Sequence, residues 1–142
     1  MIRLGPLHHV AVAVPRIADA LPFYRDRLGL GAGAIRELPD QRVRVVFVGA
    51  EGQRIELIEA MDGTSGVAKF VAERGRPTLH HVCYLVDDLR ASLRELVASG
   101  VELIDSEPRQ GSEGLVAFLH PRASDGVLIE LVDRASLAEP IR

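Results

Sequence analysis

The dipeptide His-His followed by valine occurs twice in the sequence, at residues 8–10 and at residues 80–82. Each copy opens an apolar, strand-like run. About fifty residues later a second apolar run holds a lone carboxylate, Glu56 in the first half and Glu130 in the second. Imidazole and carboxylate side chains together suit a divalent transition metal. The matched spacing predicts a duplicated module in which each copy gives one imidazole and one carboxylate to a common metal centre.

The alternation of side chains along a strand indicates which histidine of each pair faces the metal. His9 shares its face with two alanines, whereas His8 shares the other face with three valines. His81 shares its face with Cys83 and a leucine, and His80 lies on the bulkier face. A bulky face suits packing under a helix and a small one suits a cavity. We therefore assign His9 and His81 to the metal and interpret His8 and His80 as structural, hydrogen-bonded groups at strand entrances.

The two carboxylates differ in how apolar their surroundings are. Glu130 lies between Ile129 and Leu131 in a run without another charge, and a buried carboxylate requires a partner or a metal. Glu56 has charged residues nearby, so its strand looks more exposed. Any one of the four residues alone is most simply a satisfied core or surface group. Four of them at matching positions in two copies favour the metal.

The pattern of the chain predicts the order β-α-β-β-β twice. In the first half we expect strands at 7–14, 31–38, 43–48 and 54–59 and a helix at 18–28, which Pro22 disturbs. In the second half we expect strands at 79–86, 101–104, 115–120 and 126–132 and a helix at 89–99 capped by Asp87 and Asp88. A short helix at 67–74, ending at Gly75, lies in the joint between the modules.

We interpret residues 1–142 as one domain. Module one covers about 7–60, the joint about 61–78 and module two about 79–133. A unit of four strands and one helix leaves one face of its sheet uncovered, so two copies side by side form one cleft.

Composition excludes several classes of function. The chain has 47% hydrophobic residues and a net charge of −3 without a basic block, so it lacks the electrostatic footprint of a nucleic-acid binder. No segment approaches the roughly twenty apolar residues of a membrane span, and the N-terminus does not resemble a signal peptide. The single Cys83 excludes an internal disulfide and fits a reducing compartment. We expect a cytoplasmic protein without nucleic-acid or membrane partners.

Segments at residues 7–14, 67–71, 79–82 with 86–89, and 118–131 carry a family resemblance. They are similar to the vicinal oxygen chelate superfamily and, more narrowly, to the methylmalonyl-CoA epimerases, with residues 118–131 as the most specific block. The resemblance implies an α+β fold in which two βαβββ modules pair into a curved mixed sheet around a metal-binding cleft. It also implies a homodimer and an acyl-CoA substrate.

By the same resemblance the metal ligands are His9, Glu56, His81 and Glu130. The metal is a divalent ion, with Co²⁺ favoured and Mn²⁺, Ni²⁺ or Zn²⁺ as alternatives.

Three departures from the family pattern bear on the site. His8 stands where the family commonly has aspartate, and the loop at 111–114 is one residue shorter than usual and lacks a common lysine. Val45 stands where some members carry a second catalytic glutamate, so that base does not carry over.

The implied reaction interconverts (2R)- and (2S)-methylmalonyl-CoA by removal and return of the α-proton. A divalent metal stabilises the enolate as a Lewis acid, and Glu130 is our choice of base. The acid or base on the opposite face is unassigned, with Glu113 and metal-bound water as weak candidates. Ser112, His120 and Arg122 are weaker candidates for substrate contacts, and His120 is more simply a residue that ends a strand at a turn.

Other functions use the same fold. A glyoxalase I-type lyase or isomerase can use the same ligand set, although the block at 119–131 argues against it. An extradiol dioxygenase needs open positions around a triad of ligands, whereas this chain offers a fourth and is short for that class. A non-catalytic small-molecule binder, of the drug-resistance type, can share the fold without the metal. Methylmalonyl-CoA and ethylmalonyl-CoA are not separable by sequence, because one methylene in an apolar pocket contributes only about 1–3 kcal/mol.

Overall fold

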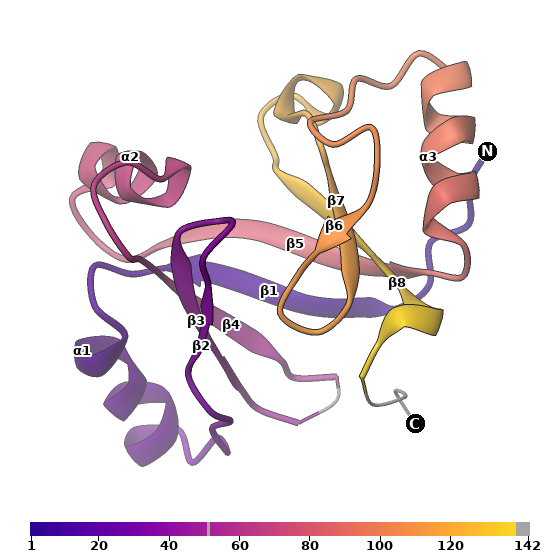
Figure 1. Ribbon diagram of the computed structural model, residues 1–142. Helices are drawn as coiled ribbons and strands as arrows, with labels where there is room; N and C mark the ends of the chain where they lie inside the picture. Colours follow the sequence, from indigo (N-terminus) through magenta and orange to yellow (C-terminus); the bar gives the residue numbers. More distant parts are fainter. Residues whose placement is uncertain (51, 139–142) are drawn as a thin grey trace. The chain divides into compact units, whose positions relative to one another are not determined.

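The computed structural model describes residues 1–50 and 52–138 and contains two compact units. The first, which we call the Glu56 unit, is His9–His80. The second, the Glu130 unit, consists of Met1–His8 together with the described residues from His81 onward. The helices and strands are labelled in Figure 1, and the two units are described separately below. No helix in the described part of the chain is long and apolar enough to cross a membrane.

The Glu56 unit is built on a mixed sheet. Its strands lie in the order β2-β3-β4-β1, with β2–β3 and β3–β4 antiparallel and β1–β4 parallel. Their bounds are Leu7–Ala13 for β1, Arg36–Leu38 for β2, Val43–Val48 for β3 and Ile55–Ala60 for β4. Strands β1 and β4, the first and last of the unit, pair in parallel, and their register places Ala11 beside Glu56.

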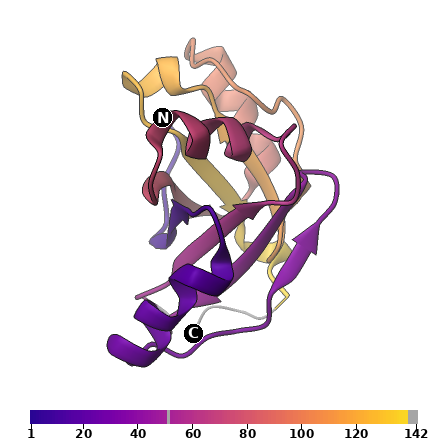
Figure 2. The same cartoon turned by 90° about the vertical axis from the view of Figure 1, so that its left-hand side faces the viewer.

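The two faces of this sheet pack against different helices. Val12 and Val14 of β1 form an apolar cluster with Ile17 of α1 (Ile17–Pro22), the indigo helix in Figure 2. Ala11 and Ala13 point to the other face, where they pack in a cluster that includes residues of α2 (Gly66–Arg74). This confirms the expectation that the valine face of the strand packs under the helix that follows it. The expectation that the alanine face lines a cavity is wrong at Ala11 and Ala13, which are fully buried in a packed cluster.

The first helix is shorter than predicted. The sequence predicts a helix at 18–28, but α1 ends at Pro22 and a π-helical segment, Phe23–Arg27, continues the chain. Proline has no N–H to give to the carbonyl of the preceding turn. Beyond Pro22 the backbone hydrogen bonds span five residues instead of four, and the N–H of Leu28 donates to the carbonyl of Phe23 at 3.0 Å. By contrast, α2 begins at a Ser65 cap and ends at Gly75, as expected for a left-handed residue with φ of 69°.

The Glu130 unit repeats the same strand arrangement. Its strands lie in the order β5-β8-β7-β6, with β5–β8 parallel and the other pairs antiparallel. Their bounds are Thr78–Val86 for β5, Arg109–Gln110 for β6, Leu115–Leu119 for β7 and Ile129–Asp133 for β8. Helix α3 (Leu89–Ala98) contacts β7 and β8 (Figure 1) and is capped by Asp88, as predicted. Two 3₁₀ turns, Pro121–Ser124 and Arg134–Ser136, follow β7 and β8.

Two strand predictions in this unit are wrong. Residues 101–104 form no strand; Leu103 makes only an isolated bridge with Leu119, and the edge strand is Arg109–Gln110. The side chain of Asp105 accepts the N–H of Phe118, so a carboxylate replaces a strand partner at this edge. The last strand begins at Ile129 and not at Gly126, because Asp125 and Gly126 have φ of 57° and 113°. Left-handed backbone is incompatible with an extended strand.

Candidate metal centre

In the Glu56 unit, parallel strands bring one imidazole to one carboxylate. Ala11 of β1 lies beside Glu56 of β4, and His9 is the next residue on the same face of β1. The Nε2 atom of His9 is 3.7 Å from Oε1 of Glu56, and the two residues are only 4% and 6% exposed. The pair is buried between apolar strand neighbours, where an uncompensated carboxylate is costly.

In the Glu130 unit the same register recurs. Cys83 of β5 lies beside Glu130 of β8, and His81 stands two residues before Cys83. The Nε2 atom of His81 is 3.4 Å from Oε1 of Glu130, and these residues are 5% and 7% exposed. Each unit therefore brings together one of the predicted imidazoles and one of the predicted carboxylates. Cys83 is a buried free thiol, as the sequence predicts.

Each pair is accompanied by a phenylalanine that the sequence analysis missed. Phe47 of β3 lies opposite Glu56, and its ring is edge-on to the His9 imidazole with 5.2 Å between centroids. Phe118 of β7 lies opposite Glu130, and its ring contacts His81 in the same way, also at 5.2 Å. A single phenylalanine in an apolar strand carries no signal of its own. Only the shared position opposite the carboxylate would have identified both.

Comparison with known proteins agrees with this duplicated arrangement. Residues 8–118 match the model of the Glyoxalase/Bleomycin resistance protein/Dioxygenase superfamily. The ethylmalonyl-CoA/methylmalonyl-CoA epimerase of Cereibacter sphaeroides is 38% identical over 90% of this chain and 97% of that protein. The chain belongs to the methylmalonyl-CoA epimerase family. Membership makes it an enzyme of the racemase and epimerase class, as the sequence predicts.

Solved structures of the epimerase family have the same fold. The methylmalonyl-CoA epimerase of Mycobacterium tuberculosis is 32% identical, with a TM-score of 0.86 over 98% of this chain and 90% of that one. A variant of the Streptomyces coelicolor enzyme, in complex with 2-nitronate-propionyl-CoA, is 27% identical. Its TM-score is 0.88 over 97% of this chain and all of that one. These likenesses confirm the predicted fold class, the α+β fold of two βαβββ modules that typifies vicinal oxygen chelate proteins.

The donor groups fit the divalent metal that this superfamily binds. His81 and Glu130 belong to a group of buried side chains whose ligand atoms lie close enough together to hold a metal ion. His9 and Glu56 offer the same nitrogen and oxygen atoms in the other unit. Imidazole and carboxylate suit Co²⁺, Mn²⁺, Ni²⁺ or Zn²⁺, whereas a site for Cu⁺ or an iron–sulfur cluster would use soft thiolates. The chemistry of both pairs is therefore compatible with the metal expected from the sequence.

Val45, which the sequence analysis matches to a second glutamate of some family members, lies in an apolar environment. Val45 is 1% exposed and packs in a cluster with Ile58, its partner on β4, and with Val67 of α2. The side chain at Val45 is therefore apolar and cannot itself transfer a proton.

The other histidines have partners of their own. His80 is half-buried, and its ring lies edge-on to Phe70 of α2 at 4.9 Å. His8 is buried, 3% exposed. His120 precedes a 3₁₀ turn, and its Nδ1 accepts the N–H of Arg122 at 3.0 Å. The structure thus gives His120 a capping role at the end of a strand.

The weaker candidates for substrate contacts lie in turns of the Glu130 unit. Arg122 donates two hydrogen bonds to the Glu102 carboxylate, at 3.1 and 2.6 Å, and these bonds hold the pKa of Glu102 below its usual value. Ser112 is half-buried in the β6–β7 turn, which the Gly111 N–H closes onto the Gly114 carbonyl. A role for Ser112, His120 or Arg122 in binding substrate stays a prediction.

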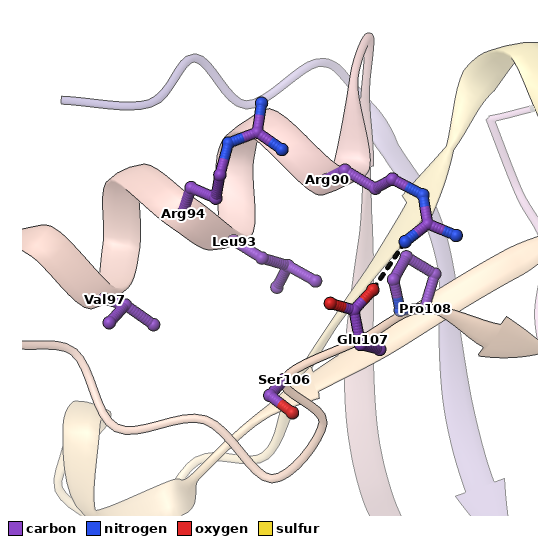
Figure 3. Close-up of a pocket in the computed structure, with 7 residues that line it drawn as sticks. All are labelled: Arg90, Leu93, Arg94, Val97, Ser106, Glu107 and Pro108. Carbon is purple, nitrogen blue, oxygen red and sulfur yellow. Dashed lines mark hydrogen bonds and ion pairs between the residues drawn. The ribbon is translucent and has the colours of Figure 1, made fainter.

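A separate cavity of about 270 Å³ is lined by residues of α3 and of the loop at 106–108. Figure 3 shows Arg90 of α3 reaching to Glu107 of the following loop, with Leu93 and Val97 further along the same helix. Arg94 points away from that loop in the same view. The residues that line the cavity include neither histidine nor the paired glutamates, so this groove is distinct from the candidate metal ligands.

Proposed function

We propose that the chain is a divalent-metal-dependent epimerase that interconverts (2R)- and (2S)-methylmalonyl-CoA by transfer of the α-proton. The observation that carries this proposal is the pair of buried His/Glu contacts at identical registers in a member of the epimerase family. A drug-binding protein of the same fold has no need of two imidazoles and two carboxylates buried at matched positions. The non-catalytic alternative therefore leaves this duplication unexplained.

We infer that four side chains bind one divalent cation together: His9, Glu56, His81 and Glu130. Two imidazoles and two carboxylates form a donor set typical of Co²⁺, Mn²⁺, Ni²⁺ and Zn²⁺, and we favour Co²⁺. When bound, such a cation supplies Lewis acidity that stabilises negative charge on the thioester oxygen of a substrate. A thiolate-rich donor set would have argued for a different metal.

Glu130 is the residue we assign as the base that takes the α-proton. Its carboxylate is 7% exposed, and its strand neighbours Ile129 and Leu131 are apolar. Exclusion of water favours proton transfer between a positioned carboxylate and a weakly acidic C–H bond. His81, 3.4 Å from the carboxylate, restricts where its oxygens lie. Glu113 is a weak side-chain candidate for the acid or base on the opposite face.

The substrate class follows from the names of the relatives. The Cereibacter sphaeroides protein is named for both ethylmalonyl-CoA and methylmalonyl-CoA, and the Streptomyces coelicolor structure holds a propionyl-CoA analogue. We infer an acyl-CoA with a branched malonyl group for this chain. We also infer a homodimer in the cytoplasm, which sedimentation of the purified protein and cell fractionation would test.

The decisive experiment is α-proton exchange of (2R)-methylmalonyl-CoA in D₂O, with protein stripped of metal and then reloaded with Co²⁺. We expect deuterium incorporation with inversion only in the reloaded sample. Absence of exchange in both samples would contradict the proposal. Turnover of a glutathione–methylglyoxal adduct by the same Co²⁺-loaded sample would favour the glyoxalase I-type lyase.

A further inference from the structure

The phenylalanine beside each His/Glu pair occupies an equivalent place in both units. Phe47 pairs across β3–β4 with Glu56, and Phe118 pairs across β7–β8 with Glu130. Each ring meets the imidazole of its own unit nearly at a right angle, with interplanar angles of 77° and 89°. Both centroid separations are 5.2 Å. The same aromatic contact therefore occurs beside both His/Glu pairs.

An imidazole ligand needs its ring plane held as well as its position. The torsion that turns a histidine ring is broad, so neighbouring groups must restrict it. Such groups are usually hydrogen-bond partners of the second ring nitrogen. A perpendicular aromatic ring restricts the same rotation by packing, because tilting the imidazole forfeits the edge-to-face contact.

We propose that Phe47 and Phe118 are positioning residues, which hold the rings of His9 and His81 in the orientation that turns Nε2 toward the carboxylate. This inference rests on the proposed function, since it assumes that these histidines bind a metal. The Nε2 atoms already face their carboxylates at 3.7 and 3.4 Å, which is the orientation that a shared cation requires.

Phe118 is itself held at two points. The guanidinium of Arg109 lies over its ring, 5.5 Å from the centroid, and the Asp105 carboxylate accepts its backbone N–H at 2.9 Å. The same carboxylate is 3.4 Å from Nε of Arg109, so one acid anchors both the strand and the cation above the ring. Phe118 is buried, whereas Phe47 is half-buried. We therefore expect the larger effect at Phe118.

The chain contains a matched control for this contact. Phe70 lies edge-on to His80 at 4.9 Å with an interplanar angle of 81°, nearly the geometry of the other two pairs. His80 is not one of the inferred ligands. Loss of the ring at Phe70 removes the same kind of aromatic contact without touching the metal.

The test compares Phe118→Leu, Phe47→Leu and Phe70→Leu for Co²⁺ affinity, by competition with a chromophoric chelator, and for the visible absorption spectrum of bound Co²⁺. We expect affinity to fall about tenfold in Phe118→Leu, within the range typical of residues that support metal ligands. A smaller fall is expected in Phe47→Leu, and no change in Phe70→Leu. The absorption bands should change in the first two variants only, a signature that lost stability alone does not produce.

The melting temperature of each metal-free variant shows whether the fold is retained. If Phe118→Leu does not fold, Phe118→Met removes the ring with an unbranched, flexible side chain that can fill the irregular gap left behind. Unchanged affinity and spectrum in folded variants at both positions would overturn the inference. His81→Ala separates a failure of the proposed metal site from a failure of the positioning role. If Co²⁺ binding survives that substitution, the proposed metal site is wrong. If it is lost while the phenylalanine variants bind normally, only the positioning role fails.

Discussion

The two units differ most in their helices and least in their His/Glu pairs. In the Glu56 unit, α1 has no side-chain cap, ends at Pro22 and continues as a π-helical turn. In the Glu130 unit, α3 runs for 10 residues from an Asp88 cap. Yet the residue two positions after each histidine lies beside the glutamate in both. Because a one-residue slip would turn every side chain to the other face, strand register is what preserves this chemistry while the helices diverge.

A second difference lies around the phenylalanines. The ring of Phe118 is covered by Arg109, and the strand that carries it is anchored by Asp105. Phe47 is the more exposed of the two rings. The His81–Glu130 pair therefore lies beside a more extensively contacted ring, and its unit also carries the residue that we assign as the base. Substitutions can test whether both pairs bind the metal equally while only the Glu130 pair transfers the proton.

Glu130→Gln should have the largest effect. Loss of a general base typically costs about 10²–10⁴-fold in rate, and we expect α-proton exchange to fall by at least that much while some Co²⁺ still binds. The matched control is Glu56→Gln, which removes the corresponding carboxylate of the other unit. It should weaken Co²⁺ binding but retain measurable exchange at saturating metal. Equal loss of exchange in both variants would show that the units share the proton-transfer duty.

Removal of the metal should weaken the folded state. A ligand that binds only the native protein adds about 2.7 kcal/mol at a free concentration one hundred times its Kd. We expect the melting temperature to rise on Co²⁺ addition to stripped protein and the rise to disappear in His9→Ala and in His81→Ala. A rise that survives in one of them would mean that a single unit binds the metal without the other.

The sequence predicts which histidine and glutamate come together in each unit better than it predicts the residues around them. Alternation along β1 placed His9 with the alanines, and the valine face does pack under α1. The sequence did not predict the edge strand Arg109–Gln110, which is only two residues long and has no alternating pattern. Beside it, the Asp105 carboxylate accepts the Phe118 N–H in place of a strand partner. Phe47 and Phe118 were not predicted because only their pairing with a glutamate on the neighbouring strand distinguishes them. The alternation of residues within one strand carries no information about that pairing.

The helix caps offer a test of the claim that helices stabilise the units without shaping the site. The Asp88 carboxylate accepts the Ala91 N–H at 2.9 Å, so Asp88→Ala should lower the free energy of unfolding by about 1 kcal/mol. Arg16, at the equivalent position before α1, makes no side-chain cap, and Arg16→Ala should change it by less than about 0.5 kcal/mol. Chemical denaturation measures both. Co²⁺ affinity should be unchanged in each variant, and a parallel loss of affinity would mean that α3 does shape the metal ligands.

Arg109→Met should have a small effect on Co²⁺ affinity, and the most specific one. It keeps much of the apolar stem but removes the cation over Phe118, a contact worth about 0.5–1 kcal/mol at a partly exposed site. If the cation steadies the ring and the ring steadies His81, Co²⁺ affinity should fall by about two- to fivefold, the equivalent of that energy. Combined with Phe118→Leu, the substitution should add nothing, since the ring through which it acts is gone. Additive losses in the double variant would show that Arg109 acts on the metal or its ligands by another route, and the support around the Glu130 pair would then have two independent parts.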